Sequence, residues 1–264
     1  MTPVESTQPV LYEIRDGAAW VTLALASLTA EVKVCLLDAL RLAGDDTSVR
    51  AVVLTGVGRN FSLGQDLGEH AEALRSGPDN AFATLREHYE PIVEALTSMP
   101  KPVVAAINGT CVGAGLSLAL ACDIRLARAG AAMATAFTGI GLSFDSGLSA
   151  TLARAVGTAR ASELVMLGRR FSAEQAESWG LVGQVVADDD WDEGVRATVN
   201  QLAAGPTQAF AAAKRAIRDS WSAPLPEVLS AERTAQIALG ATSDHRGAVE
   251  AFLDKRRPSF DGRG

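Results

Sequence analysis

One stretch without charged residues, 103–122, restricts the possible folds of this chain more than any other. It begins with the apolar run Val103–Ile107, which favours a buried strand, and continues through Asn108-Gly109, a pair typical of turns. Small residues from Gly113 onward then lead into a Leu- and Ala-rich segment that predicts a buried helix. Strand, turn and helix in this order present backbone N–H groups at a helix start, where they suit an anion or a polarised carbonyl.

Three other interpretations of this stretch have weaker support. Its length alone would allow it to span a bilayer, but Asn108-Gly109 and the Gly113–Gly115 cluster interrupt it, which favours a buried strand and helix. A dinucleotide-binding loop would need a third glycine, which does not follow Gly113–Gly115. A nucleophilic serine elbow would need a glycine two residues after the serine, and Ser117 is followed by Leu118-Ala119.

Length, charge and cysteine usage narrow the class of protein. A chain of 264 residues that is 48% hydrophobic can bury one large α/β core, alone or with an appendage. The formal charge of −7 argues against a nucleic-acid surface, which needs a basic face. No secretory signal is expected, since residues 1–5 lack a positive segment followed by an apolar run. Three cysteines in apolar stretches indicate reduced core residues of a cytoplasmic protein with no metal site: Cys35, Cys111 and Cys122.

Strands and helices alternate along the chain up to Val186, and from Trp191 only helices are expected. Residues 70–80 are polar and predict a mobile segment. A hairpin is expected around Asp16-Gly17 and a helix from Ala30, capped by Thr29. The remaining predicted elements are strands at Ala51–Gly56, Ile124–Ala127, Ala131–Thr138 and Val182–Val186, and helices at 81–97, 148–155, 159–167 and after Ser172, with a break at Gly157.

Two loops that carry glycine each follow an apolar strand, at Leu63-Gly64 and at Ala114-Gly115. If these strands are neighbours, both loops open at the same edge of the sheet, and two backbone N–H groups can converge on one oxygen. Such a pair stabilises an oxyanion or enolate, and one donor is typically worth about 3 kcal/mol of activation barrier. The sequence therefore predicts an oxyanion hole made of backbone groups.

A series of short motifs in a fixed order carries a family resemblance. The motifs are Val53–Gly56, Phe61–Leu67, Pro102–Gly109, Cys122-Asp123, Leu152–Gly157, 173–182 and Phe252–Pro258. With them, the chain resembles the crotonase, or enoyl-CoA hydratase/isomerase, superfamily over nearly its whole length. The resemblance implies an α/β fold, a crotonase (ClpP-like) spiral of ββα units with the acyl-CoA site over residues 1–190, and a C-terminal helical trimerisation region over 191–264. It also implies no metal or redox cofactor, because coenzyme A is part of the substrate.

The resemblance further assigns the oxyanion donors to the N–H groups of Leu63 and Ala114. Residues that match the adenine-binding loop of the family are Gly64, Gln65 and Asp66. Phe252 and Lys255 match C-terminal residues that help to close a CoA site, often on a neighbouring subunit, although Lys255 could equally lie on a solvated helix end. The implied partners are an acyl-CoA thioester and further copies of the chain, as a homotrimer or a hexamer (a dimer of trimers), with no nucleic acid and no membrane.

Two positions depart from the hydratase pattern. Hydration of an alkene needs two carboxylates, which position and deprotonate a water molecule and protonate the α-carbon. In hydratases both are glutamates. Here the corresponding residues are Ser117 and Phe137, the second falling at or beside that position. Ser117 on a buried helix is expected to bond to a backbone carbonyl, and His88 to face solvent on an amphipathic helix. The standard hydratase mechanism is therefore not expected.

Asp145 is the acid that remains in the site-forming region. It occupies the position of a catalytic aspartate in isomerase-like relatives and in the chlorobenzoyl-CoA dehalogenase branch. Phe144 and Leu142 flank it, so a raised pKa would let it shuttle a proton between the α- and γ-carbons of an enoyl thioester. The alternative is that Asp145 caps the helix that starts at Leu148. The leading hypothesis is an enoyl-CoA isomerase; the alternatives are an enoyl-CoA hydratase (lyase) of fatty-acid breakdown and a catalytically silent acyl-CoA-binding protein.

Overall fold

A six-stranded sheet forms the middle of the molecule, which this computed structural model describes over residues 8–262. Its strand order is β1 (Val10–Arg15), β2 (Ala18–Leu23), β4 (Ala51–Gly56), β7 (Val103–Ile107), β9 (Ile124–Arg128) and β12 (Gln184–Val186). The β1–β2 pair is antiparallel and the other pairs are parallel. All residues of β7 are buried, as expected for an apolar strand covered on both faces. The strand predicted at the start of the uncharged stretch is confirmed.

The first two strands form the predicted hairpin. Asp16 and Gly17 connect them with φ angles of 50° and 75°. Two consecutive residues in the left-handed region are typical of the tight turns whose twist matches that of the strands. The turn is predicted at this pair because aspartate and glycine adopt positive φ angles at low energetic cost.

Two smaller sheets, made of very short strands, lie beside the large one. The four-stranded sheet has the order β11 (Phe171–Ser172), β10 (Ala132–Ala134), β8 (Thr110–Val112) and β5 (Asn60–Ser62), and the two-stranded sheet pairs β3 (Ser27–Leu28) with β6 (Gly64–Gln65). Strands of two or three residues are too short to show a period-two pattern, so most of them were not predicted. The strand expected at Ala131–Thr138 is reduced to β10.

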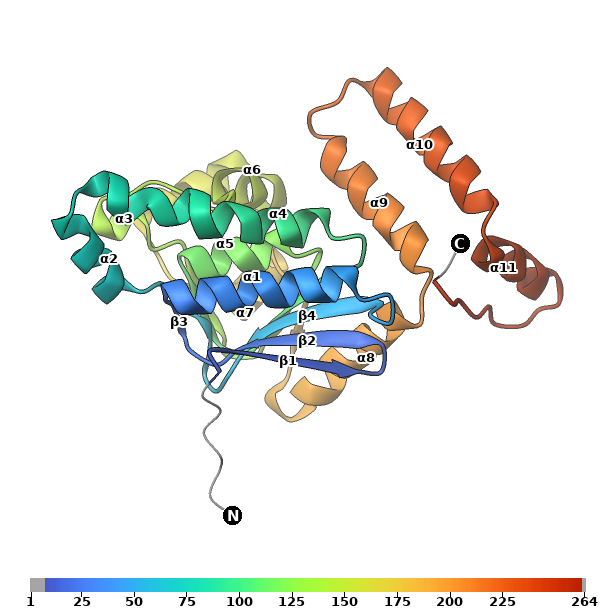
Figure 1. The fold of residues 1–264 in the computed structure, drawn as a ribbon, viewed down its shortest axis with the longest axis horizontal. Helices are drawn as coiled ribbons and strands as arrows, with labels where there is room; N and C mark the ends of the chain where they lie inside the picture. The colour runs from blue at the N-terminus through green and yellow to red at the C-terminus, as the bar shows by residue number, and fades with distance from the viewer. Residues whose placement is uncertain (1–7, 263–264) are drawn as a thin grey trace, which may run out of the picture.

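Helices cover both faces of the large sheet (Figure 1). One face packs against α1 (Ala30–Asp45), α4 (Glu90–Ser98), α5 (Ala114–Ala121) and α6 (Leu148–Leu167), and the other packs against α8 (Trp191–Ala203). Alternate residues of β7 belong to the two cores: Val103 and Ala105 face the first, Val104 and Ala106 the second. This alternation is the period-two pattern of a strand buried on both sides.

The segment expected to be mobile, residues 70–80, is instead helical. It belongs to α2 (Leu67–Arg75) and α3 (Pro78–Thr84), which a π-helical turn, η1 (Leu85–Tyr89), connects to α4. Asp66 and Pro78 supply start signals for the two helices, at the N-cap of α2 and at the first position of α3. Further along, the break at Gly157 is confirmed, because this residue bends α6 with φ 76° and ψ 157°.

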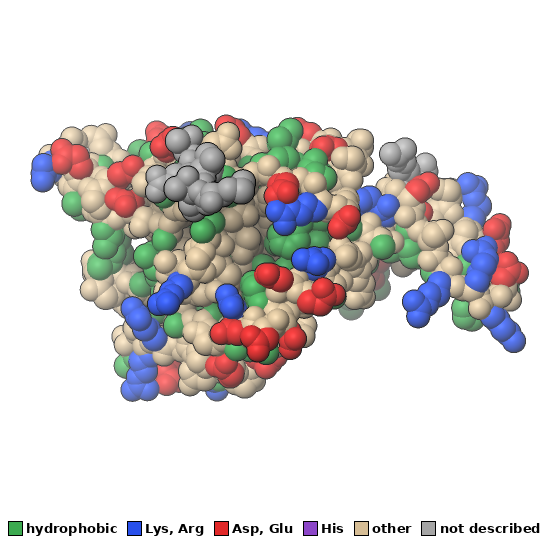
Figure 2. Space-filling view, turned by 90° about the horizontal axis from the view of Figure 1, so that it is seen from below, with side chains coloured by type: hydrophobic (Ala, Val, Ile, Leu, Met, Phe, Trp, Pro, Cys, Tyr) green, Lys and Arg blue, Asp and Glu red, His purple; other side chains and the backbone are tan. Residues whose placement is uncertain are grey.

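Helix α8, the first helix after residue 190, packs against the large sheet. Val195 and Val199 of this helix belong to the same apolar cluster as Val53 and Val104 of the sheet, so α8 is part of the core. A helical arm follows and consists of α9 (Thr207–Asp219), α10 (Leu225–Gly240) and α11 (Ser243–Leu253). Figures 1 and 2 show this arm extending away from the body. The remaining short elements are η2 (Thr138–Ile140), α7 (Ala173–Ser178) and η3 (Asp188–Asp190).

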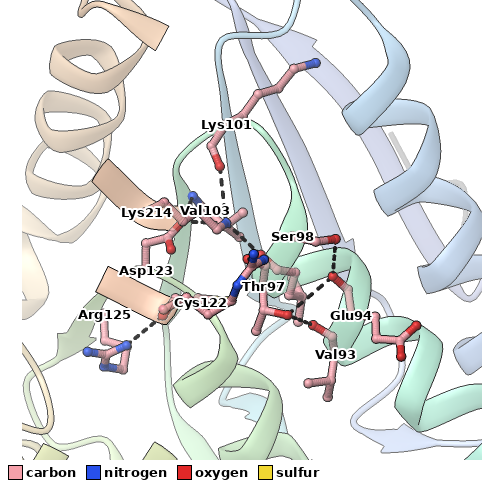
Figure 3. A network of polar contacts seen from close by, with 12 residues as sticks. Val93, Glu94, Thr97, Ser98, Lys101, Val103, Cys122, Asp123, Arg125 and Lys214 are labelled. Carbon is pink, nitrogen blue, oxygen red and sulfur yellow. Dashed lines mark hydrogen bonds and ion pairs between the residues drawn. The ribbon is translucent and has the colours of Figure 1, made fainter. Parts of the chain in front are cut away.

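A partly buried ion pair ties the arm to the body (Figure 3). Lys214 on α9 places Nζ 2.8 Å from Oδ2 of Asp123, and the same oxygen accepts a hydrogen bond of 2.8 Å from the Val103 N–H. Lys214 also donates to the Leu96 carbonyl, at 2.7 Å, near the end of α4. A cation suits this place because the last carbonyls of a helix carry partial negative charge.

Replacing Lys214 by methionine should lower the free energy of unfolding by about 2 kcal/mol, because several charge-assisted hydrogen bonds are lost. The matched control is Arg215→Met, on the exposed side of the same helix, which should change stability little. Chemical denaturation of both variants measures the difference. Equal stability of the two variants would show that this ion pair does not anchor the arm.

The remaining observations concern membrane-spanning helices, metal-binding groups, surface charge and the cysteines. Among residues 8–262 no helix is both long and apolar enough to cross a membrane, and no group of His, Cys, Asp and Glu could hold a metal ion. On the face in Figure 2, basic side chains are scattered among acidic ones. Cys35, Cys111 and Cys122 are free, and burial raises the pKa of the Cys122 thiol to about 12. The expectation about a secretory signal rests on residues 1–5, which lie outside the described part.

Candidate active site

The two glycine-bearing loops meet at one edge of the sheet. Strands β4 and β7, which precede them, are parallel neighbours, so the condition set by the sequence is met. Gly64 has φ +79°, and a Cβ atom built on it would lie 3.1 Å from the Ala114 nitrogen and 3.0 Å from the Val112 carbonyl oxygen. A Cβ on Gly115 would lie 2.6 Å from the Cβ atom of Ser62. Glycine at both positions lets the two backbones approach closely.

The Ala114 N–H lies at the positive end of a buried helix. Ala114 is the first residue of α5, and the preceding N-cap residue, Gly113, has no side chain to cap it. The Gly113 carbonyl already accepts from Leu116 and Ser117, the regular bonds of the first turn. The leading N–H groups of a helix have no partner within it, so the Ala114 N–H is placed to donate to a bound oxygen.

The Leu63 N–H cannot serve as the second donor, and this prediction is wrong. It donates to the Ala26 carbonyl at 2.7 Å. In the same loop, the Gly64 N–H donates to Ser62 Oγ at 3.1 Å and the Asp66 N–H to the Leu28 carbonyl at 3.3 Å. The bond to Ala26, the residue before β3, thus occupies the Leu63 amide that the family resemblance assigned to the oxyanion hole. The residues around Leu63 give no sign of this bond, because Ala26 is distant in the chain.

Asp145 does not cap the helix that follows it. The N-cap of α6 is Gly147, and no side chain makes a capping bond there. Between them, Ser146 has φ 52°, an uncommon conformation for a residue other than glycine and one that occurs often at functional sites. The Asp145 carboxylate is half-buried and accepts a hydrogen bond of 2.8 Å from Ser146 Oγ. The capping alternative for Asp145 is therefore wrong.

The surroundings of Asp145 favour proton exchange. Burial raises the pKa of Asp145 above its ordinary value, while the Ser146 hydroxyl and the charge of Lys33 oppose this rise. A carboxyl group whose pKa moves toward neutrality can both accept and return a proton.

The sequence did not predict a buried polar cluster around Lys33, the residue whose charge acts on this carboxylate. Lys33 on α1 is only 2% exposed and donates to Gln65 Oε1 at 2.9 Å and to Thr84 Oγ1 at 2.6 Å. Tyr89, which is 1% exposed, donates to the same Gln65 oxygen at 2.9 Å. One signal was available: Lys33 occupies the apolar stripe of α1 together with Leu36 and Leu40.

His88 belongs to the edge of this cluster rather than to the solvent-facing side of a helix. Its Nδ1 atom lies 3.1 Å from Thr84 Oγ1, and its side chain is half-buried. His88 belongs to the π-helical turn η1, an element that inserts an additional residue into the helical register and occurs often at functional sites. Burial lowers the pKa of His88, and the positive charge of Lys33 lowers it further.

The two residues at the positions of the hydratase glutamates are buried and not acidic. Ser117 is fully buried, and its Oγ donates to the Gly113 carbonyl at 3.4 Å, the backbone contact that the sequence favoured. Phe137 belongs to the larger apolar core, next to Ala136, whose φ is 63°. Neither side chain can take or give a proton in this site.

The other candidate residues are divided between two ends of the molecule. Gln65 directs its side chain inward to the polar cluster, and the Asp66 carboxylate caps α2 by accepting from the Glu69 N–H at 2.9 Å. Phe252, which is 82% exposed, and Lys255 lie at the end of α11. Figure 1 shows α11 and α2 at opposite ends of the molecule. Phe252 and Lys255 are thus not brought to the site within one subunit.

Comparisons with known proteins agree with this arrangement. The sequence profile of the family described as enoyl-CoA hydratase/isomerase matches residues 17–263. A Rhodobacter capsulatus protein named "Probable enoyl-CoA hydratase" is 43% identical over 98% of this chain and 100% of its own length. The 1,2-epoxyphenylacetyl-CoA isomerase of Escherichia coli is 37% identical over 96% of this chain and 98% of its own.

The fold is equally well matched. A crystal structure from Mycobacterium abscessus, of the enoyl-CoA hydratase/isomerase group, superimposes with a TM-score of 0.92 at 48% identity and covers 96% of this chain and 100% of that one. The ββα units and the C-terminal helices described above are those of the crotonase fold. By sequence and by fold, this chain belongs to the enoyl-CoA hydratase/isomerase family of the crotonase superfamily.

Proposed function

We propose that this protein is an enoyl-CoA isomerase that works through a thioester enolate, with Asp145 as the proton shuttle. The observation that carries the proposal is the state of Asp145: its carboxylate is half-buried, makes no helix cap, and has a pKa raised by burial. The positions of the hydratase glutamates hold Ser117 and Phe137 instead. The acyl-CoA substrate class follows from the family.

The enolate oxygen would be held by two backbone N–H groups. The first is Ala114 at the start of α5. We assign the second to Gln65, because the Asp66 N–H points to β3 and successive amide groups of an extended strand point to opposite sides. The Gln65 N–H therefore faces away from β3. This assignment replaces Leu63, whose N–H is already bonded to Ala26.

The proposed reaction moves one proton and one double bond. The Asp145 carboxylate removes a proton from the α-carbon of a 3-enoyl thioester, and the electron pair passes into the thioester as a dienolate. The protonated Asp145 then returns the proton to the γ-carbon, and the double bond becomes conjugated with the carbonyl. Charge develops on the thioester oxygen in the intermediate, where the two N–H donors would stabilise it most.

Hydration is the second candidate function. The name of the R. capsulatus relative favours it, and so does the high identity to that protein over the whole chain. A hydratase mechanism would need a group other than Ser117 and Phe137 to position water. The name of the E. coli relative, an isomerase, supports the first candidate at somewhat lower identity.

We also propose that the protein assembles as a homotrimer or as a hexamer of two trimers, in the cytoplasm. The helical arm exposes large apolar side chains that a monomer would leave in water: Ile217, Trp221, Leu225, Leu229, Ile237, Val249, Phe252 and Leu253. Surfaces of this kind usually mark contacts between proteins. Assembly would also allow Phe252 and Lys255 to reach the site of a neighbouring subunit.

Incubation with 2-enoyl-CoA and with 3-enoyl-CoA tests the reaction directly. Isomerisation gives a product of unchanged mass with a change in ultraviolet absorbance, because conjugation with the thioester is gained or lost. Hydration adds the mass of one water, and a silent binder leaves both substrates intact. A hydroxyacyl product formed at a substantial rate would refute isomerisation as the main activity.

A further inference from the structure

Lys33 is a buried charge whose contacts differ from those of an ordinary structural lysine. Lys101 is also buried, at 6% exposure, but it donates to the carbonyl oxygens of Ala43 and Asp46, both at 2.6 Å. These carbonyls lie at the end of α1, so Lys101 simply stabilises a helix terminus. Lys33 instead bonds to two side chains, those of Thr84 and of Gln65, which belongs to the candidate oxyanion loop.

The hydrogen bonds of the cluster determine which of its groups donate and which accept. Lys33 and Tyr89 both donate to Gln65 Oε1, which uses the two acceptor positions of that oxygen. The Gln65 Nε2 group donates to the Asp66 carbonyl at 3.1 Å, which fixes the orientation of the amide. Thr84 accepts from Lys33, so its own hydroxyl proton is available to His88 Nδ1. Lys33 thus holds the side chain of the residue assigned as the second oxyanion donor.

The charge of Lys33 also acts on Asp145. Lys33 is the cation whose charge lowers the pKa of Asp145. Burial raises the pKa of Tyr89 on η1, and the charge of Asp145 raises it further. Burial lowers the pKa of Lys33, and the negative charges of Glu69 on α2, Asp145 and Asp66 act in the opposite direction. His88 is the other titratable group in contact with this cluster, and Glu87 and Glu69 act on it.

We propose that Lys33 is a positioning residue of the active site: its buried ammonium group, bonded to Gln65 and Thr84, holds the oxyanion loop and supplies a positive charge that acts on Asp145. The proposal rests on the proposed function for the role of Asp145. Without this charge, only the Ser146 hydroxyl opposes the effect of burial, and the protonated form of the carboxyl group is favoured more. A protonated Asp145 cannot remove the α-proton, so activity falls on the acid side of the pH profile.

The test compares Lys33→Gln and Lys33→Met with Lys101→Met, the matched buried lysine outside the site. The titration of Asp145 is followed by ¹³C NMR of protein labelled at the aspartate carboxyl carbons, with Asp145→Asn identifying the signal. In both Lys33 variants the midpoint should move upward by about one pH unit, and Lys33→Arg should restore it. Lys33→Gln keeps a donor toward Gln65 and guards against misfolding of Lys33→Met. Lys101→Met should leave the midpoint unchanged.

Turnover provides a second readout. The acid side of the pH profile of kcat/KM should shift in the same direction in the Lys33 variants, and kcat on the plateau should fall more than KM rises. An unchanged Asp145 titration in folded Lys33→Gln would overturn the proposal. The titration of Asp145 needs no substrate, so it tests the role of Lys33 even if the wild-type protein converts neither enoyl-CoA. Absence of turnover would count against the proposed function alone.

Discussion

Replacement of Asp145 by asparagine should lower isomerase turnover by about a thousandfold or more, which is toward the upper end for a general acid–base group. The effect is large because the same carboxylate takes the proton from the α-carbon and returns it to the γ-carbon. Asparagine keeps the size and the hydrogen bond to Ser146 but cannot exchange a proton at neutral pH. Steady-state kinetics with 3-enoyl-CoA measures the loss.

Two controls separate chemistry from structure in this experiment. Binding of a non-reactive acyl-CoA, measured by calorimetry, should persist in Asp145→Asn, because Asp145 makes no helix cap that the fold requires. Exchange of the substrate α-proton with deuterated water should disappear together with turnover. If turnover is undiminished, or if α-proton exchange continues at the wild-type rate, Asp145 is not the shuttle.

Replacement of Ala114 by proline should reduce kcat by about 10²- to 10³-fold, the usual cost of removing one oxyanion donor. Proline lacks the N–H group, and Ala114 is the first residue of α5, the one helical position where proline is readily accepted. The substitution therefore removes the proposed donor while preserving the helix. Kinetics with the same substrate and a thermal melt are measured in parallel.

Ala114→Gly is the matched control, because it changes the side chain at the same position and keeps the backbone donor. It should retain most of the wild-type kcat. A proline variant with a normal melting temperature and normal kcat would show that this N–H does not stabilise the transition state. A fall in activity of equal size in both variants would point to the side chain instead.

Local sequence was sufficient for the larger elements. The apolar run of β7, the turn after it and the small residues at the start of α5 each follow preferences of a few neighbouring residues, and all three occur as predicted. The bend at Gly157 has the same origin. Residues 70–80 were judged by polarity alone, whereas the caps at Asp66 and Pro78 make them helical.

The sequence by itself determined the family, the strand, turn and helix that present Ala114, and the replacement of the hydratase acids by Ser117 and Phe137, because these are properties of residue identity and order. Only the tertiary structure decided which backbone amide groups already donate a hydrogen bond and which buried charged side chains find polar partners. Leu63 loses its predicted role to a bond with Ala26, and Lys33 gains one from Gln65 and Thr84, which are 32 and 51 residues away in the chain. Contacts over such separations arise from the packing of whole elements, and no local pattern encodes them.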